Sequence, residues 1–344
     1  MKAVSVVVPC YNAALYLEKC ILQLLHQTIG MEKIEIILVN DASTDDGATW
    51  KLIREYEHQY PETILAITLD QNMRQGGARN IGVAYATGEY IMFCDADDWL
   101  LEEALEHCYC AAKRYDADVV EFLIKNVEDF RVQISEIEKG NKDILINIDT
   151  DEERKNFLIS ADNRLSLGSQ KKLYRRSMIQ ENHIQFIEHC IFEELSFLVP
   201  VRMFERRHYF LDEALYICFL SPGSSMRGKW GEHKWDNPKV WLHLLSDMEE
   251  RGFLQKYYPE LEFLFFRWGF GLSIRMALQK GYVLSKEELL FLVNIVTERF
   301  PDVSQNKYLQ EYKDTWDELI MTLLQLEITD ESATVVNEIL RKYV

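Results

Sequence analysis

Two aspartates one residue apart, Asp95 and Asp97, are the strongest candidates for chemistry in this sequence. They lie at the end of an apolar run over residues 90–95, which predicts a buried strand. Carboxylates that converge without matched cations repel one another, and their hard oxygens suit Mg²⁺ or Mn²⁺, which also binds substrate phosphates. The pair therefore predicts a divalent metal site. The alternative is a solvated turn that caps the helix expected from about Leu100.

The elements that position these aspartates alternate between strand and helix patterns. Short runs rich in Val and Ile predict strands that are covered on both faces. This order predicts a mostly parallel α/β sheet with flanking helices, in which ligands bind at the carboxyl ends of the strands. The strands are expected at 4–9, 34–40, 64–69 and 90–95, and the helices at 13–25, 48–60 and 77–86.

Polar residues follow the other strands of this predicted sheet as well. Because the carboxyl ends of parallel strands meet at one edge, we expect these residues to share a site with the aspartate pair. In chain order they are Pro9, Tyr11, Asn12, Asp41 and Asn72.

Beyond residue 118 the pattern loosens and then becomes helical. A Pro-Gly-Ser-Ser loop at 222–225 predicts a domain boundary, with an α/β domain over 1–220 and a helical domain over 221–344. The aromatic face at 263–270 is more typical of a core than of a homodimer interface, an acceptor platform or a membrane contact. Strands are expected at 119–124, 130–134 and 144–148, and helices at 151–160, 176–182, 193–205, 240–254, 260–279 and 286–300.

Composition limits the partners and the compartment. The 344 residues include 38 Lys and Arg against 56 Asp and Glu, a formal net charge of −18. This balance argues against nucleic acid as a partner, because nucleic acid is itself anionic. The seven Cys lack a paired C-x-x-C arrangement and fit neither a zinc site nor a disulfide framework. No apolar run is long enough to span a bilayer, so we expect a cytoplasmic protein, with a peripheral place at the inner membrane face as the alternative.

Four blocks of the sequence, in this order, resemble family 2 glycosyltransferases with a GT-A fold. The blocks are residues 4–12, 39–45, 72–82 and 88–99, and weaker matches follow at 172–177, 192–197 and 215–227. The resemblance covers about residues 1–228. It implies a Rossmann-like GT-A domain that binds a nucleotide sugar, and it says little about the helical domain.

The family pattern assigns a role to each matched position around the nucleotide. Pro9, Tyr11 and Asn12 would line the nucleotide pocket. Asp41 would accept a hydrogen bond from the uracil N3, which carries a donor N–H.

The next two blocks would hold the phosphates and the metal. Asn72, Gly77 and Arg79 would close the pocket around the nucleotide, with the Arg79 guanidinium on a phosphate oxygen. Asp95 would hold the ribose and assist the metal. Asp97 would be the principal ligand of Mn²⁺ or Mg²⁺, the Lewis acid that neutralises the leaving diphosphate.

A pair of acids at the start of a helix supplies the general base in this family. The family has Glu-Asp there, and the matching pair here is Glu193–Glu194. We therefore expect Glu194 to be the base, Glu193 to contact the acceptor sugar, and the anomeric carbon to be inverted. The pair could also be ordinary acids of a first helical turn, and Glu194 is one methylene longer than the usual Asp.

A few further residues have weaker claims on the site. Ser224, Ser225 and Arg227 lie on a loop that could fold over the diphosphate. His189 and His208 are more typical of packed or exposed histidines than of ligands to the metal or acceptor.

The sequence as a whole predicts an inverting, metal-dependent glycosyltransferase. It would move a hexose or N-acetylhexosamine from a UDP-sugar to a hydroxyl of a glycan, a polysaccharide or a glycoprotein, lipid-linked acceptors included. Two alternatives stay open. A sugar-1-phosphate nucleotidyltransferase would need an early Gly-rich loop, which is missing after the first strand. A nucleotide-sugar-binding or scaffolding module would lack the base, and Glu194 in place of Asp motivates that interpretation.

Overall fold

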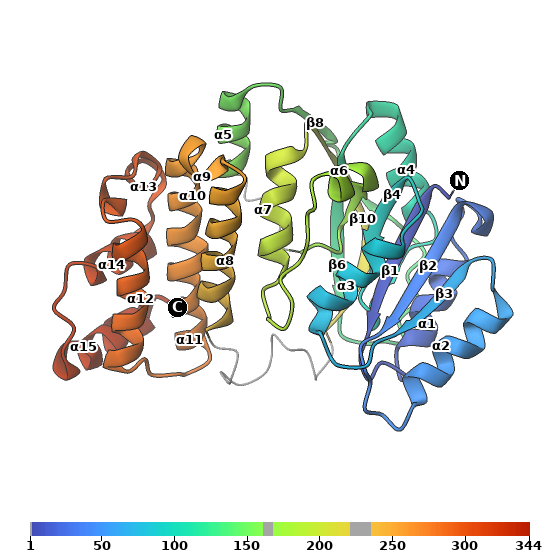
Figure 1. The fold of residues 1–344 in the computed structure, drawn as a ribbon, viewed down its shortest axis with the longest axis horizontal. Helices are drawn as coiled ribbons and strands as arrows, with labels where there is room; N and C mark the ends of the chain where they lie inside the picture. Colours follow the sequence, from blue (N-terminus) through green and yellow to red (C-terminus); the bar gives the residue numbers. More distant parts are fainter. Residues whose placement is uncertain (1, 161–167, 221–234) are drawn as a thin grey trace. The chain divides into compact units, whose positions relative to one another are not determined.

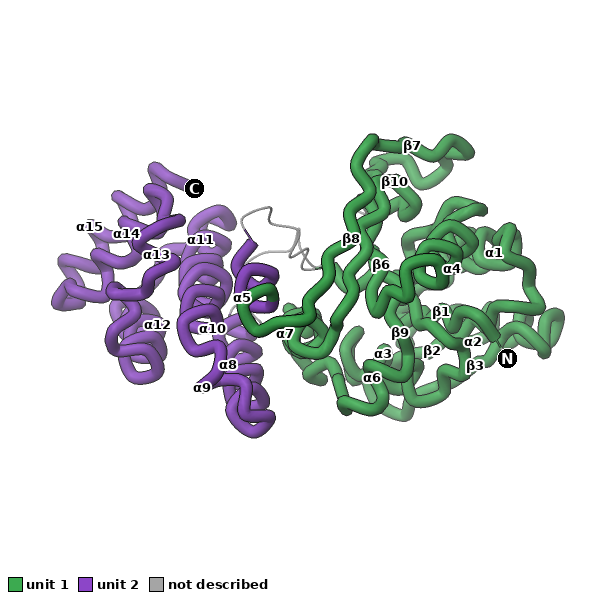
Figure 2. Tube along the Cα trace, turned by 90° about the horizontal axis from the view of Figure 1, so that it is seen from above, with its two compact units in different colours: residues 1–153, 166–224 green, residues 154–165, 225–344 purple. Residues whose placement is uncertain are grey.

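Two compact units make up the chain (Figure 2). Unit 1 consists of residues 1–153 and 166–224, and unit 2 of residues 154–165 and 225–344. The computed structural model describes residues 2–160, 168–220 and 235–344. The predicted boundary at residues 220 and 221 lies at the edge of a segment outside the described residues, so it stays a prediction.

Unit 1 is built on one large sheet (Figure 1). Its first four strands pair in parallel, as predicted, and their order in the sheet is β3-β2-β1-β4. The sheet continues β9-β6-β10-β5, with β9 antiparallel to both of its neighbours, and β7 and β8 pair with β10. The strands are β1 (Val4–Cys10), β2 (Ile34–Asn40), β3 (Ile64–Thr68), β4 (Tyr90–Phe93), β5 (Trp99–Leu100), β6 (Val119–Val127), β7 (Glu138–Lys139), β8 (Ile144–Asn147), β9 (Lys172–Arg175) and β10 (Arg207–Phe219).

Helices cover both faces of this sheet, which explains its continuous apolar strands. Side chains alternate along β1: Val6 and Val8 pack in the cluster that contains α1, α2 and α4, while Val7 packs on the other face with α3, α6 and α7. The fold class predicted from the sequence is confirmed. The helices are α1 (Leu17–Leu25), α2 (Ala48–Gln59), α3 (Arg74–Tyr85), α4 (Ala104–Tyr115), α6 (Arg176–Glu181) and α7 (Glu194–Phe204), and α5 (Asp151–Ile159) crosses the boundary between the units.

The strand predicted at 130–134 is wrong, because this segment has no regular structure. The Lys19 ammonium lies 3.2 Å from the ring centroid of Trp99 and donates to the carbonyl oxygens of Phe130 (2.6 Å) and Val132 (2.9 Å). The two carbonyls thus accept from a side chain, and the segment pairs with no neighbouring strand among the described residues. The apolar side chains of the segment instead pack beside Trp99, Ile217 and Phe219.

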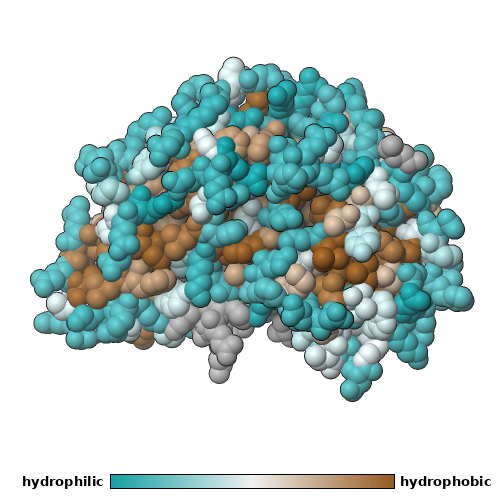
Figure 3. Space-filling model, in the orientation of Figure 1, coloured by the Kyte–Doolittle hydropathy of each residue, from teal (hydrophilic) through white to brown (hydrophobic). Residues whose placement is uncertain are grey.

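Unit 2 is helical, as predicted. The aromatic side chains of Phe263, Phe265, Phe266 and Phe270 are buried, so this face forms part of a core. Apolar side chains also remain exposed on the unit, and Figure 3 shows apolar areas among the polar surface. None of the helices that the structure describes is long and apolar enough to cross a membrane. The helices are α8 (Asp236–Glu250), α9 (Phe253–Lys256), α10 (Tyr258–Leu264), the π-helical η3 (Phe265–Gly271), α11 (Leu272–Gln279), α12 (Lys286–Arg299), α13 (Lys307–Tyr312), α14 (Thr315–Leu323) and α15 (Asp330–Leu340).

Candidate active site

Three carboxylates converge on one buried guanidinium at the carboxyl edge of the sheet. Arg79 of α3 donates from Nη2 to Asp95 Oδ1 (2.8 Å) and from Nη1 to Glu193 Oε1 (2.7 Å). Glu194 Oε1 lies 3.9 Å from the same Nη1. The structure thus brings the predicted metal-side aspartate and the predicted base pair together around a single cation.

Close packing of α3 against the start of α7 makes this convergence possible. A Cβ on Gly76 would lie 2.4 Å from the carbonyl oxygen of Ile187 and 3.0 Å from Glu193 Cγ, so only glycine allows the approach. Asn80 then holds the segment before α7, because its amide donates to the Phe186 carbonyl (2.8 Å) and accepts from the Phe186 N–H (2.9 Å). Helix α3 therefore fixes both Arg79 and the approach to Glu193.

The aspartates of the turn after β4 differ in their burial and in their partners. Asp98 is buried and accepts from the Tyr216 hydroxyl (2.7 Å) and the Phe219 N–H (2.8 Å). Burial first, and then the charges of Asp95 and Asp97, raise the pKa of Asp98 to about 8. Asp98 therefore stabilises the turn, and its neighbours Asp95 and Asp97 are partly exposed.

The donor set of this turn fits a divalent cation. Asp95 and Asp97 offer hard carboxylate oxygens at a partly open edge, and Mg²⁺ or Mn²⁺ commonly takes one or two carboxylates together with substrate phosphates. Among the residues described in the structure, no group of three or more His, Cys, Asp or Glu side chains forms a metal cluster.

The residues predicted around the nucleotide lie on adjoining loops at the same edge. Asp41, buried after β2, accepts from the Met73 N–H (2.7 Å), and Asn72 donates to the Asp41 carbonyl (3.1 Å). Burial raises the pKa of Asp41 more than hydrogen bonds from the backbone of Met73 and Arg74 lower it.

The loops after β1 and β2 are joined to each other. Asn12 donates from Nδ2 to Thr44 Oγ1 (3.2 Å) and accepts from the Thr44 N–H (2.7 Å). Pro9 is buried within β1, whereas the Tyr11 ring is 49% exposed at the rim. Asn12 therefore holds the rim together, and the Tyr11 ring is accessible beside it.

Charge is unevenly balanced among the acids around Arg79. Burial alone would lower the pKa of Arg79, but Asp95 and Glu193 outweigh it and keep the guanidinium charged. Burial raises the pKa of Glu193. Burial first, and the neighbouring Glu193 second, raise the pKa of Glu194 to about 8. One cation thus serves three carboxylates, and a carboxyl with a raised pKa suits proton transfer near neutral pH.

Several predicted residues have surroundings that the sequence did not anticipate. Arg79 is bonded to Glu193. Gly77 packs against Met73, and a Cβ on Gly77 would lie 2.4 Å from the Met73 Cβ. His208 is buried between Glu121 and Glu205 in the interior. The backbone of His189 donates to the Met73 carbonyl (3.2 Å), beside Asp41. Ser224, Ser225 and Arg227 lie outside the described residues.

Tyr216 falls in one of the weaker matches to the family, but the sequence assigned it no role in the site. Its hydroxyl accepts from the Asp95 N–H (3.0 Å) while it donates to Asp98, so it holds both ends of the metal-side turn. Tyr216 is 121 residues away from Asp95 in sequence, on a strand that pairs with β5 and β6. The weak match at this position does not reveal its partners, because they are remote in sequence.

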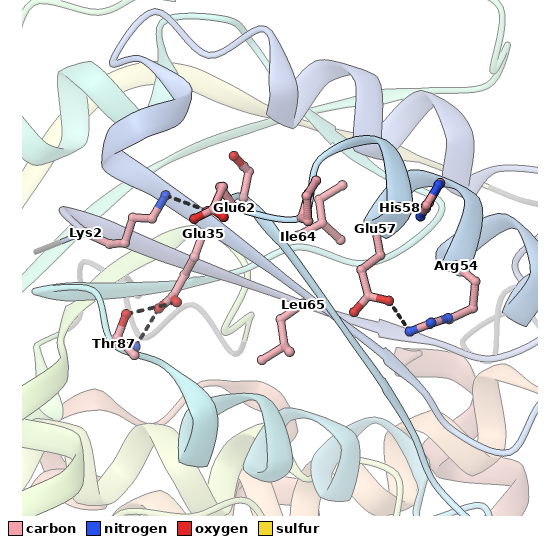
Figure 4. Close-up of a pocket in the computed structure, with 11 residues that line it drawn as sticks. Lys2, Glu35, Arg54, Glu57, His58, Glu62, Ile64, Leu65 and Thr87 are labelled. Atoms are coloured by element: carbon pink, nitrogen blue, oxygen red, sulfur yellow. Dashed lines mark hydrogen bonds and ion pairs between the residues drawn. The ribbon is translucent and has the colours of Figure 1, made fainter.

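A cavity of about 400 Å³ lies at the opposite, amino edge of the sheet (Figure 4). Its charged walls bond to each other: Arg54 pairs with Glu57, and Glu35 accepts from the Thr87 N–H and hydroxyl. None of the predicted site residues lines it. The lining consists of Lys2, Glu35, Arg54, Glu57, His58, Pro61, Glu62, Thr63, Ile64, Leu65 and Thr87.

Known proteins resemble this chain in sequence. The model of glycosyl transferase family 2 matches residues 5–181, more than half of the chain. The poly(ribitol-phosphate) beta-glucosyltransferase of Bacillus spizizenii is 30% identical over 186 residues, which cover 54% of this chain and 27% of that protein. Glycosyltransferase GlyA of Streptococcus pneumoniae is 29% identical over 262 residues, which cover 72% of this chain and 34% of that protein. The chain thus spans about a third or less of the length of these two relatives.

A solved structure resembles the chain over its whole length. It is that of S. aureus TarS residues 1–349 in complex with UDP-GlcNAc, with a TM-score of 0.69 and 22% sequence identity. The match covers 100% of this chain and 92% of that one. At this identity the likeness bears on the fold, and it confirms the predicted GT-A type.

Proposed function

The chain belongs to glycosyl transferase family 2 and is a glycosyltransferase, and from that premise we propose that it is an inverting enzyme that uses a UDP-sugar and a divalent metal. It would transfer a hexose or N-acetylhexosamine to a hydroxyl of a cell-envelope glycan, with a teichoic-acid-type polymer as the first acceptor class to test. The convergence of Asp95, Glu193 and Glu194 on Arg79 carries the proposal.

The choice of donor is supported by Asp41 and by a structural neighbour. A buried carboxylate at the end of β2 suits the N3–H donor of uracil, and the exposed Tyr11 ring offers a surface on which a base can stack. The TarS structure of similar fold holds UDP-GlcNAc.

The choice of acceptor class is supported by the relatives. One is named as a poly(ribitol-phosphate) beta-glucosyltransferase, and a second, TarP of Staphylococcus aureus, as a poly(ribitol-phosphate) beta-N-acetylglucosaminyltransferase, 32% identical over 124 residues. These 124 residues cover 35% of this chain and 36% of TarP.

The proposed mechanism assigns one task to each element of the edge. A cation at Asp97 and Asp95, when bound, supplies a Lewis acid for the leaving diphosphate. Glu194, with its side chain 25% exposed, takes the proton from the acceptor hydroxyl as that oxygen attacks the anomeric carbon from the opposite face. A direct displacement of this kind inverts the anomeric configuration.

A donor screen tests the proposed function. UDP-glucose, UDP-galactose, UDP-GlcNAc and UDP-GalNAc are each incubated with the chain and Mn²⁺, with and without poly(ribitol phosphate), and released UDP is measured. We expect turnover with one of these donors, its loss in EDTA, and loss of metal-dependent UDP binding in Asp97→Ala. Metal-independent turnover that survives Asp97→Ala would contradict the metal assignment, and UDP binding without any turnover would contradict the proposed transferase activity.

A further inference from the structure

We propose that Arg79 is a positioning residue that locks Asp95 and the Glu193–Glu194 pair into one arrangement, and that it makes no contact with the donor phosphates. This inference rests on the proposed function, in which Asp95 serves the donor side and Glu194 the acceptor side. It replaces the phosphate contact that the sequence alone predicts for Arg79.

Burial of Arg79 is the first argument. Its side chain is 1% exposed, and both of its Nη atoms already donate to carboxylates, at 2.7 and 2.8 Å. The remaining nitrogen, Nε, is buried and has no hydrogen-bond partner among the described residues. Because the side chain is 1% exposed, a phosphate oxygen could reach this guanidinium only after a side chain that covers it, such as Asp95 or Glu193, had moved, and a carboxylate that moved would lose a charge-assisted hydrogen bond.

The shape of the guanidinium is the second argument. Its planar fork donates to two acceptors in fixed directions, which a single ammonium cannot do. The two acceptors come from different parts of the fold, Asp95 from the turn after β4 and Glu193 from the start of α7. One rigid group therefore sets the separation between the donor side and the acceptor side of the reaction.

The surroundings of Arg79 show that this arrangement is prepared by the fold. The guanidinium carbon lies 5.4 Å from the ring centroid of Phe186, a distance typical of a cation–π contact. Asn80, the next residue along α3, fixes Phe186 through two hydrogen bonds. The same helical turn therefore supplies the cation and anchors the ring that covers it.

The inference also changes the role of Glu193. Its side chain is 4% exposed and bonded to Arg79, whereas that of Glu194 is 25% exposed and lies 3.9 Å from the guanidinium. Glu193 is therefore a second positioning residue rather than a contact for the acceptor sugar. Glu194 is the member of the pair that meets the acceptor.

Replacement of Arg79 by Lys separates positioning from phosphate binding. Arg79→Lys keeps the charge and loses the fork. Calorimetry measures the affinities for UDP and for uridine, in EDTA and in Mn²⁺. Steady-state kinetics with the donor found in the screen give kcat and KM. Because misplacement of reacting groups by about 1 Å costs on the order of 10²-fold in rate, we expect kcat to fall about 100-fold while UDP affinity in EDTA stays within about threefold. A loss of UDP affinity of tenfold or more with unchanged uridine affinity would overturn the proposal, because it is the signature of a phosphate ligand.

A second variant keeps the test decisive if Arg79→Lys does not fold, which thermal melting detects. Glu193→Gln retains an oxygen that can accept from Arg79 and removes one charge. Glu193→Gln alone should lower kcat and leave the acceptor KM unchanged, because it loosens the bond to Arg79 without touching the acceptor. Where Arg79→Lys folds, the double variant should lose little more kcat than Arg79→Lys alone, because Arg79 and Glu193 act as one unit. If the two losses multiply, or if Glu193→Gln raises the acceptor KM with kcat unchanged, the proposal is wrong.

A matched control is Arg54→Lys, at an exposed ion pair on the amino edge of the sheet, which should leave kinetics and UDP affinity unchanged. A wild-type chain that binds no UDP would overturn the proposed function itself and this inference with it. A wild-type chain that binds UDP and turns over, combined with a phosphate-ligand signature in Arg79→Lys, would overturn the inference alone.

Discussion

Helix α7 carries a buried charge cluster at each end, and the two clusters are balanced in opposite ways. At its start, one cation, Arg79, serves three carboxylates. At its end lies what we call the Glu121 cluster, defined by Glu121, Lys171, Lys172, Arg202, Glu205 and His208. In that cluster Glu121 alone has Lys171 at 3.2 Å, His208 at 3.4 Å and Lys172 at 3.5 Å.

The difference in balance appears in the titration of the two clusters. Burial would raise the pKa of Glu121, but Lys172 first and then His208 outweigh it and hold that pKa well below its usual value. Around Arg79 the carboxylates are in surplus, and the pKa of Glu194 rises to about 8. The Glu121 cluster has the opposite surplus, because four basic side chains, Lys171, Lys172, Arg202 and His208, surround the two carboxylates of Glu121 and Glu205. A surplus of carboxylates leaves a group ready to exchange a proton or to accept a cation, whereas a carboxylate among surplus cations stays ionised.

The largest effect is expected for Glu194→Gln, which removes the proposed base but keeps its shape. Because general-base catalysis contributes roughly 10²- to 10⁴-fold, kcat should fall by about that factor while UDP affinity stays unchanged. Steady-state kinetics and calorimetry check this. Glu62→Gln, at an exposed site on the amino edge, is the matched control. Near-normal transfer by Glu194→Gln would disprove the base assignment.

Glu121→Gln is the counterpart in the Glu121 cluster, and its effect should be on stability. Removal of one partner leaves buried cations uncompensated, and such breaks cost about 3 kcal/mol in free energy of unfolding. Urea unfolding measures that loss, and kcat per folded molecule should stay near the wild-type value. If Glu121→Gln were as stable as the wild type but inactive, the distinction between the clusters would be lost.

The pH dependence of the rate should reveal the surplus of carboxylates around Arg79. A base must be ionised, so a pKa of Glu194 near 8 in the free enzyme predicts that kcat/KM rises with pH up to about that value. A cation bound at Asp95 and Asp97 shifts this limb to lower pH. Because Glu193 is the second cause of the raised pKa, Glu193→Gln should also shift the limb to lower pH. A pH–rate profile that is the same in Glu193→Gln and in the wild type would contradict this coupling.

The positions of the candidate site residues were predictable from local patterns. Apolar runs that alternate with amphipathic helices identify the strand ends, and the strand ends carry Asp41, Asp95 and Asp97. The start of α7 at Glu194 was predicted to within one residue in the same way.

The partners of those residues were not predictable, because they are remote in sequence. Arg79 and Glu193 are 114 residues apart, and their bond depends on close packing at Gly76. The strand β10 was missed because its polar residues, such as His208, have buried ion partners that no local pattern reveals. Likewise, the segment 130–134 has the sequence pattern of a strand, but two of its carbonyl oxygens accept hydrogen bonds from the remote Lys19.

The smallest effect is expected for His208→Gln, which tests the linkage between the Glu121 cluster and pH. Burial would lower the pKa of His208, but Glu205 and then Glu121 outweigh it and raise that pKa above 6.5. A raised pKa means that the folded chain holds this proton more tightly than the unfolded chain. The stabilisation is therefore complete below the unfolded pKa and is lost as pH rises through the folded pKa.

His208→Gln should lower the free energy of unfolding by about 1 kcal/mol at about pH 5.5, the usual net value of a hydrogen bond, and by less at about pH 9. Urea unfolding at both pH values measures the difference, with the exposed His58→Gln as the control. An equal loss of unfolding free energy at both pH values would mean that His208 contributes packing, and not charge, to the Glu121 cluster.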